Sequence, residues 1–375
     1  MTRAGTGPKG TALTSADAAV IGGGVIGLSV ACHLAEAGVG TVLLERDELG
    51  SGASRATADM VRTFFPGNPV SSAMAVRSLA VYRSFEARTG VALPLRRVGY
   101  LVVYTTREQI AAFEADLPAQ RAAGVDVALV GAAEARRRNP LLGGLDVLAA
   151  AWSPDAYVSD TAAIVGGFAA AARRAGARLL TGRPVTAVDT TAGRLDTPAG
   201  PVRAGAVICA AGAWSAPLAR SAGVDLPFTE PVEQELLTTG DPPPGVVVPG
   251  IPMTLVAASG LLVRKRGNGL LVGMGYPGPE RDGWRARVRE RLDATYPALA
   301  GVELRTAFTG VRDASPDRTA FIGRLPGATP FLYAAGFSGH GLCTAPAAGE
   351  LVRDLYFGRE PEVDARRLAA GPERV

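Results

Sequence analysis

Two groups of residues in this chain have types and spacing suited to chemistry. The first is Gly22, Gly24 and Gly27, a GxGxxG pattern, followed by Glu45. In such a pattern the first glycine permits a tight turn, the second lets a pyrophosphate approach the backbone, and the third lets a helix pack closely on a strand. The carboxylate of Glu45 can accept hydrogen bonds from ribose hydroxyls. These residues predict a dinucleotide site.

The second group lies in GFSGHGLCTAPAAGELV, residues 336–352, which contains one of two histidines and one of three cysteines. His340 and Cys343 are spaced so that they could form a nucleophile and base at the start of a helix. Nothing near them supplies a third orienting group, however. We prefer the interpretation that the glycines let the backbone approach a bound ring, while Cys343 is incidental.

The elements around the first group have the order that a dinucleotide site requires. Residues Ala18–Ile21 read as a buried strand, Val25–Ala37 as a helix ended by Gly38, and Thr41–Glu45 as a second buried strand. This is a βαβ unit, and it places the glycines at a helix N-terminus, where N–H groups and the dipole favour phosphate.

The rest of the chain alternates helices and strands. Further helices are expected over 70–88, 108–122, 160–176, 281–296 and 341–356, and strands over 97–104, 127–130, 178–180, 185–188, 206–210, 304–311 and 331–335. Residues 228–275 instead show short strand-like runs between Pro and Gly turns, which is typical of an antiparallel sheet. We therefore expect an α/β fold, a Rossmann-type binding domain with an inserted, mostly antiparallel substrate domain.

The expected domains are discontinuous. Residues 17–90, 151–222 and 305–360 would form the dinucleotide-binding domain, and 91–150 and 223–304 the substrate domain. Residues 1–16 and 361–375 would be tails. The second group, at the end of the chain, then belongs to the same domain as the first.

Composition excludes several classes of protein. The 375 residues are 47% hydrophobic and 20% charged, which excludes a disordered chain, and no apolar stretch is long enough to span a membrane. A formal charge of +4 without a basic run interleaved with aromatics gives no indication of nucleic-acid binding. Cys32, Cys209 and Cys343 are too widely spaced for a disulfide framework or a metal site. A cytoplasmic protein without metal is expected, and an oligomer is possible.

Four stretches resemble the FAD-dependent D-amino acid oxidase superfamily, especially its glycine oxidase and sarcosine oxidase branches. They are LLERDELGSGASRATADMVRTFF (43–65), VGYLVVY (98–104), VICAAGAWSAPLA (207–219) and GVRDASPDRTAFIG (310–323). The resemblance extends from about residue 17 to 358. It implies a glycine oxidase-like fold with FAD bound in an extended conformation.

The cofactor contacts are expected from six segments of the chain, the first five of them by that resemblance. They are Gly22, Gly24, Val25, Ile26 and Gly27 at the phosphates; Glu45 and Arg46 at the ribose; Ala53, Ser54, Ala58, Asp59 and Met60 along the flavin; Val185 at the adenine and Gly212 in the Ala-Ala-Gly turn; and Gly339, His340, Gly341 and Leu342 under the flavin ring. The last segment would act through backbone N–H groups at the edge where negative charge collects on reduction.

The resemblance also implies two arginines at the substrate. Arg312 falls where glycine oxidase and D-amino acid oxidase keep a carboxylate-binding arginine, and Arg62 matches an arginine that the sarcosine oxidase branch places near flavin and substrate. A guanidinium fork can hold a carboxylate by two hydrogen bonds. The alternative for Arg312 is a surface salt bridge, and for Arg62 it is a phosphate or surface contact.

Three positions depart from the sarcosine oxidase pattern. Gly310 stands where that branch has the cysteine that bonds the flavin, so noncovalent FAD is expected. Leu271 and Cys343 replace two lysines, one assisting oxygen reduction and one binding substrate. Sarcosine itself is therefore disfavoured, and either oxygen or another compound could accept the electrons.

We expect an enzyme that oxidises the C–N bond of a small amino acid, or an N-alkyl or cyclic one, by hydride transfer to flavin N5, giving an imine. One alternative is a 2-hydroxy acid dehydrogenase or the flavin subunit of a larger electron-transfer complex. Another is a nonenzymatic nucleotide-binding protein.

Overall fold

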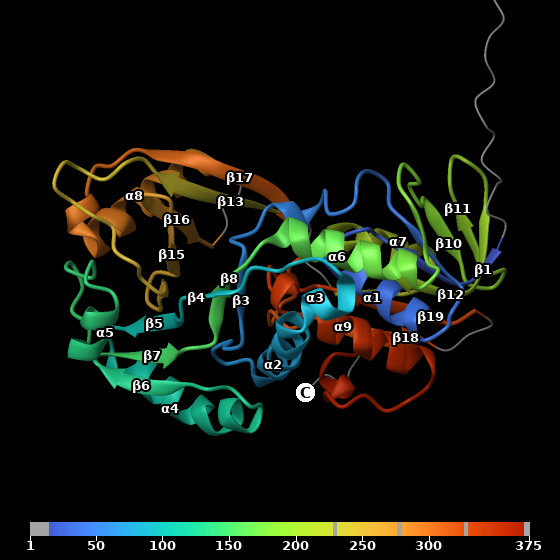
Figure 1. The fold of residues 1–375 in the computed structure, drawn as a ribbon, viewed down its shortest axis with the longest axis horizontal. Coiled ribbons are helices and arrows are strands. Elements are labelled where there is room, and N and C mark those ends of the chain that lie inside the picture. Colours follow the sequence, from blue (N-terminus) through green and yellow to red (C-terminus); the bar gives the residue numbers. More distant parts are fainter. Residues whose placement is uncertain (1–14, 228–230, 276–279, 326–328, 371–375) are drawn as a thin grey trace, which may run out of the picture.

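The computed structural model describes residues 15–227, 231–275, 280–325 and 329–370. Two large sheets lie toward opposite ends of its long axis (Figure 1). A small three-stranded sheet lies between them and consists of β3 (Met60–Arg62), β8 (Ala156–Val158) and β4 (Arg96–Arg97). This arrangement confirms the expected α/β fold with a second, sheet-based part.

The first sheet has the strand order β10-β11-β12-β1-β2-β9, with β19 also pairing β12, and β18 pairing β19. Its strands are β1 (Ser15–Ile21), β2 (Thr41–Leu44), β9 (Arg178–Leu180), β10 (Ala187–Asp189), β11 (Arg194–Asp196), β12 (Val202–Cys209), β18 (Phe321–Leu325) and β19 (Phe331–Ala335). The pairs of β1 with β2 and β12, of β2 with β9 and of β12 with β19 are parallel.

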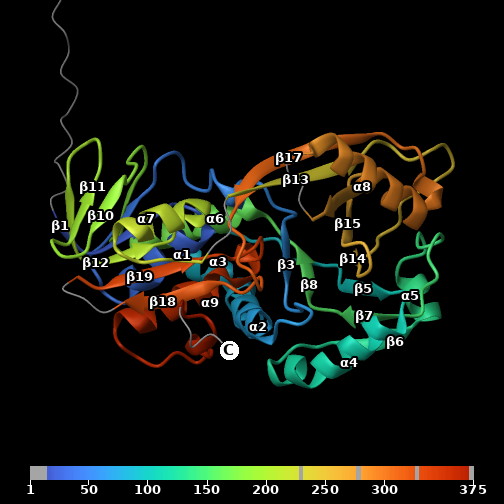
Figure 2. The ribbon, with the colours of Figure 1, turned by 180° about the vertical axis from the view of Figure 1, so that it is seen from behind.

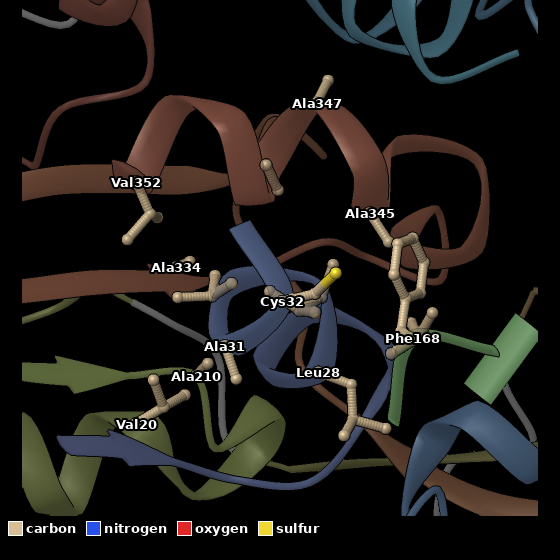
Figure 3. Close-up of a cluster of buried hydrophobic side chains, with 14 of the residues drawn as sticks. Val20, Leu28, Ala31, Cys32, Phe168, Ala210, Ala334, Ala345, Ala347 and Val352 are labelled. Atoms are coloured by element: carbon tan, nitrogen blue, oxygen red, sulfur yellow. The ribbon is translucent and has the colours of Figure 1, made fainter. Parts of the chain in front are cut away.

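Helices cover both faces of this sheet because its central strands are apolar on both sides. One face packs against α1 (Val25–Glu36), α6 (Thr161–Arg174) and α9 (Gly341–Tyr356), and Figure 3 shows part of that core around Cys32. The opposite face packs against α7 (Ser215–Ser221). Helix α1 is buried over all of its residues except Glu36, since it lies between the sheet and α9.

The second sheet has the order β17-β13-β16-β15-β14-β5-β7-β6, and every pair except β14 with β5 is antiparallel. Its strands are β5 (Tyr100–Tyr104), β6 (Ala128–Gly131), β7 (Ala149–Ser153), β13 (Val232–Thr239), β14 (Met253–Val256), β15 (Leu261–Arg266), β16 (Gly269–Met274) and β17 (Leu304–Arg312). Helices α5 (Ala132–Arg138) and α8 (Arg281–Thr295) contribute to the core on one face, and α4 (Arg107–Ala122) to that on the other. The sheet, seen from behind in Figure 2, is mostly antiparallel as expected.

The expected helix over 70–88 is two helices, α2 (Pro69–Arg83) and α3 (Phe85–Thr89). The break is at Ser84, whose hydroxyl donates to the carbonyls of Ala80 and Val81. Such a local bond competes with the backbone hydrogen bonds of the helix.

Short 3₁₀ helices complete the described elements: η1 (Ala53–Arg55), η2 (Gly212–Trp214), η3 (Pro297–Leu299) and η4 (Ala365–Arg367).

Three details bear on the expected domain limits. Strand β17 pairs with β13 along its length, so residues 304–312 belong to the second sheet rather than to the first domain. Strand β1 already begins at Ser15, while 1–14 lie outside the described residues. Leu368 is fully buried, so 361–370 pack on the fold and are not a free tail. We propose to keep the expected division with these three changes.

Candidate functional site

The turn between β1 and α1 has the geometry that the GxGxxG pattern predicts. Gly22 has φ +108°, and a Cβ there would lie within 3.0 Å of the Ala210 carbonyl oxygen. A Cβ on Gly27 would collide with the Gly22 carbonyl oxygen. Only glycine fits these two positions, which bring α1 close to β1 and leave its first N–H groups directed out of the helix end.

The opposite wall of this turn is the loop after β2. The hydroxyl of Ser54 accepts a hydrogen bond from the Val25 N–H at 3.0 Å, and a Cβ on Gly24 would lie 3.3 Å from the same oxygen. The loop therefore lies against the helix N-terminus and takes up one of its N–H groups.

Glu45 is held in place by the backbone on both sides. One carboxylate oxygen accepts the Gly23 N–H at 2.6 Å and the other accepts the Asp47 N–H at 2.8 Å. Each oxygen keeps lone-pair capacity for a further donor. Next to it, the guanidinium carbon of Arg46 lies 3.7 Å from the ring centroid of Trp214. This end of the site combines a fixed carboxylate with a flat aromatic and cationic surface.

A single cavity of about 580 Å³ connects this turn to the second sheet. The sequence-predicted residues that line it are Gly22, Gly24, Val25, Ile26, Glu45, Arg46, Ala53, Ser54, Ala58, Met60, Arg62, Val185, Gly212, Arg312, Gly339, His340, Gly341 and Leu342. Two others, Gly27 and Asp59, are not among the lining residues. Gly27 serves the helix packing described above.

Asp59 has a different place from the one expected. Its backbone is left-handed, with φ +52°, and its carboxylate accepts the Thr161 hydroxyl at 2.8 Å. The guanidinium of Arg264, on β15 of the second sheet, lies 3.5 Å from its other oxygen. Asp59 thus links residues 53–60, a loop expected beside the flavin and called the flavin-side loop below, to α6 and to the second sheet, and it is not among the residues that line the cavity.

Arg312 ends β17 at the far side of the cavity. Its Nη1 donates to the Ser338 carbonyl at 3.2 Å. Ser338 and Gly339 are both left-handed, with φ +53° and +81°, and a Cβ on Gly339 would collide with that same Nη1. The strained loop before α9 therefore shapes the position of the guanidinium.

Arg62, on β3, lines the cavity from another direction. Its guanidinium carbon lies 3.8 Å from the Phe65 ring centroid and 4.9 Å from that of Tyr100, and its Nη1 donates to the Phe64 carbonyl. The Phe65 ring in turn packs on His340, with ring centroids 4.6 Å apart. The arginine is thus held by two aromatic rings and a backbone carbonyl.

His340 and Cys343 both line the cavity, and the Cys343 N–H donates to the His340 carbonyl at 3.0 Å, but the thiol bonds elsewhere. The Cys343 thiol donates to the Met60 carbonyl at 3.3 Å. Burial raises the pKa of this thiol, while burial and the charges of Arg62 and Arg312 lower the pKa of His340 well below its usual value. The thiol is therefore not activated and the imidazole is neutral, which disfavours a Cys–His nucleophile.

Sequence reasoning missed the part of the cavity wall that the second sheet supplies. Gln234 and Leu236 on β13, Met253 on β14 and Leu262 on β15 line it, as does Trp214. Gln234 and Leu236 are two positions apart on one strand and so share a face. The alternation along this strand could have identified Gln234 and Leu236 together, but only if the face of the sheet that meets the cavity were already known.

The residues present fit a bound dinucleotide. The turn has no space for a Cβ at its first and third glycines, the helix N-terminus faces the cavity, and a carboxylate is fixed beside it.

Among the described residues, no group of three or more His, Cys, Asp and Glu side chains is placed to hold a metal ion. Likewise, within the described ranges no helix is both long and apolar enough to cross a membrane. Fold and site define a dinucleotide-binding protein whose cavity continues from the glycine turn to the second sheet.

Comparison with known families makes this assignment specific. The family model "FAD dependent oxidoreductase" matches residues 17–355, and the chain belongs to this family. FAD is therefore its cofactor, and the resemblance seen in the sequence is confirmed.

Individual relatives include both oxidases and dehydrogenases. The chain is 31% identical to glycine oxidase of Geobacillus kaustophilus, over 93% of this chain and 94% of that one. It is 26% identical to mitochondrial dimethylglycine dehydrogenase of Mus musculus, covering 94% of this chain but only 44% of that protein. The chain thus spans less than half the length of that relative. The crystal structure of L-proline dehydrogenase from P. horikoshii superposes with a TM-score of 0.84 at 26% identity, covering 95% of this chain and 97% of the other.

Proposed function

We propose that this chain oxidises the C–N bond of a small amino acid, or of an N-alkyl or cyclic amino acid. The observation that carries the proposal is the position of Arg312, which lines the same cavity as the glycine turn but at the end next to the second sheet. An amino acid has a carboxylate next to the carbon that is oxidised. One guanidinium fork can therefore both bind the substrate and orient that carbon.

FAD supplies the oxidising chemistry when bound, since it accepts a hydride from the substrate carbon and passes two electrons on to oxygen or another acceptor. The chain's own residues bind and orient. Gly22, Gly24 and the start of α1 hold the phosphates, and Glu45 holds a ribose. The N–H groups at the start of α9, which lines the cavity, would stabilise negative charge on the reduced cofactor.

The imidazole of His340 is not suited to act as a base near neutral pH. His340 is neutral because burial and two arginines lower its pKa, and the neutral imidazole carries no charge that would repel a cationic amine. Hydride transfer needs the substrate amine in its unprotonated form, and His340 does not take up that proton. After oxidation the imine is hydrolysed by water, which releases the amine and a carbonyl product.

We propose that FAD is bound without a covalent link. At Gly310, the position of the flavin-bonding cysteine in the sarcosine oxidase branch, a Cβ would collide with the Cβ of Ala56 in the flavin-side loop. Any side chain at this position would push that loop away. The close approach of β17 to the loop supports a noncovalent cofactor.

Two measurements test the function. Anaerobic mixing of the purified holoenzyme with matched amino acids, N-methyl amino acids, cyclic amino acids and 2-hydroxy acids should bleach the flavin band only with amines. Bleaching by hydroxy acids alone would overturn the proposal. Acid precipitation should release the yellow colour to the supernatant, whereas colour in the pellet would contradict noncovalent binding.

We further propose a cytoplasmic location. The three cysteines, Cys32, Cys209 and Cys343, are free and buried, which suits a reducing compartment. Its partners would be the amine substrate and an electron acceptor. Fractionation of the native host, with the flavin protein followed by antibody, tests the location.

A further inference from the structure

The loop that leads into α9 has an unusual backbone. It consists of residues 336–339, and Gly336, Ser338 and Gly339 all have positive φ, at +74°, +53° and +81°. Ser338 carries a Cβ, so this conformation costs free energy and persists only where surrounding contacts over-determine it. Ser338 and Gly339 also line the cavity. The contacts that hold this loop therefore shape the cavity as well.

A buried carboxylate holds the beginning of the loop. Asp313 is 6% exposed and directly follows Arg312, the last residue of β17, and its Oδ2 accepts the Gly336 N–H. Burial raises the pKa of Asp313, while bonds from the N–H groups of Gly336, Phe337 and Asp313 itself act in the opposite direction. A buried carboxylate needs such donors. The carboxylate and the loop backbone thus satisfy one another.

Ser315 holds the second half of the loop. Its N–H donates to the Ser338 hydroxyl at 3.0 Å, and the two hydroxyl oxygens are also 3.0 Å apart. The Ser338 hydroxyl in turn donates to the Gly336 carbonyl at 3.2 Å. Both serines are buried. Two of the three residues that follow Arg312 are therefore bonded to the loop.

The loop in turn contacts the side chain of Arg312. Nη1 of the guanidinium donates to the Ser338 carbonyl at 3.2 Å. The arginine side chain is thus bonded to a loop that is itself bonded to the residues directly after Arg312 in the chain. If the loop moved, the Ser338 carbonyl would move away from the guanidinium.

We infer that Asp313 and Ser315 are positioning residues for the substrate. They hold residues 336–339 in place, and the Ser338 carbonyl of this loop orients the guanidinium of Arg312. The inference rests on the proposed binding of the substrate carboxylate by Arg312. The effect of both residues on the substrate passes through that guanidinium.

The first test follows the flavin absorption band while propionate is titrated into the oxidised holoenzyme, so it does not depend on turnover. Propionamide, which has the same shape without the charge, is the reference. Propionate should bind the unaltered protein at least tenfold more tightly than propionamide, and Arg312→Gln should remove most of this preference. Equal binding of the two probes, or an unchanged preference in Arg312→Gln, would overturn the proposed role of Arg312 and this inference with it.

Asp313→Asn then separates position from charge. Loss of a negative charge beside the cavity would by itself tighten the binding of an anion. The amide of asparagine has one acceptor oxygen in place of two, so the loop should be held less firmly and propionate should bind roughly tenfold more weakly. Unchanged or tighter propionate binding in a folded, yellow Asp313→Asn protein would refute the positioning role, while a preserved preference in Arg312→Gln would identify the other failure.

Ser315→Ala changes no charge and tests the second contact. It removes the hydroxyl that faces Ser338 and leaves the bond from the Ser315 N–H, so propionate should bind about two- to tenfold more weakly. This variant decides the question if Asp313→Asn does not fold. Propionate binding as tight as in the unaltered protein would contradict the inference.

Two comparisons separate positioning from a general loss of stability. Asp189→Asn is the matched control, since Asp189 also accepts two backbone N–H groups, those of Thr191 and Ala192 at 2.9 and 3.0 Å, but does not line the cavity. It should leave the affinity for both probes unchanged. In an Arg312→Gln background, Asp313→Asn should weaken propionate binding little further, because both changes act through one group. Fully additive losses, or a lower melting temperature with the propionate preference intact, would show a merely structural role and refute the inference.

Discussion

Replacing Gly339 by alanine should weaken substrate binding through Arg312. The residue has φ +81°, where a Cβ costs about 1–2 kcal/mol of folding stability. The new Cβ would also lie 2.4 Å from Nη1 of Arg312, so the guanidinium must move by roughly 1 Å to reach ordinary contact. Because this is the end of a flexible side chain, it can move, but it then loses its bond to the Ser338 carbonyl and its alignment. A charge-assisted bond of about 1.5–3 kcal/mol corresponds to a fall of roughly 10- to 100-fold in kcat/KM.

The assay is anaerobic flavin reduction over a range of substrate concentrations, together with the melting temperature. Gly90→Ala is the matched control, since Gly90 has φ +76°, an open surrounding and no place in the cavity. It should reproduce the loss of stability without the loss of kcat/KM. In an Arg312→Gln background, Gly339→Ala should add little further loss, because both changes act through one group. Full additivity of the two losses, or an unchanged kcat/KM in Gly339→Ala, would refute the reasoning.

Three further outcomes are expected. Cys343→Ala should leave the rate of flavin reduction within about twofold, since burial keeps the thiol protonated; near-complete loss would revive a pair with His340. Trp214→Phe should remove the largest share of the tryptophan quenching seen when FAD is added to apoprotein, because Trp214 lines the cavity under Arg46; an unchanged amplitude would place the cofactor elsewhere. His33 is buried and its pKa is lowered to about 3, so the unfolded chain binds the extra proton between about pH 6.5 and 3. Unfolding free energy should therefore fall as pH falls through this window, by about 1 kcal/mol per pH unit, and His33→Gln should reduce that slope in urea titrations; an equal slope would rule this group out.

The dinucleotide half of the site could be predicted from sequence because local chemistry determines it. Gly22 and Gly27 are required by contacts within one βαβ unit, and Glu45 follows directly from the next strand. Asn68 and Asp160 are residue types that favour the N-cap position, and their side chains accept the Ser71 and Ala163 N–H groups. The contacts that the residues of this half would make with the phosphates and the ribose stay predictions.

The substrate half could not be predicted in the same way because it depends on which strands become neighbours. Gln234 and Leu262 reach the cavity only through the pairing of β13 with β16 and of β16 with β15. Asp59 was misplaced for a related reason, since its partners Thr161 and Arg264 lie far along the chain. Ser84 breaks a helix through hydroxyl bonds that helical periodicity does not reveal.

The cavity draws on both ends of the chain, and this affects when it can form during synthesis. Strand β1 needs β12, nearly 190 residues later, and α1 needs α9, whose first turn closes the cavity over Ile26. Contacts of such sequence separation form slowly. A nascent chain can therefore make the glycine turn early but cannot retain FAD until residues beyond 342 have left the ribosome. Stable binding of FAD by the chain should therefore mark the end of folding and not its beginning.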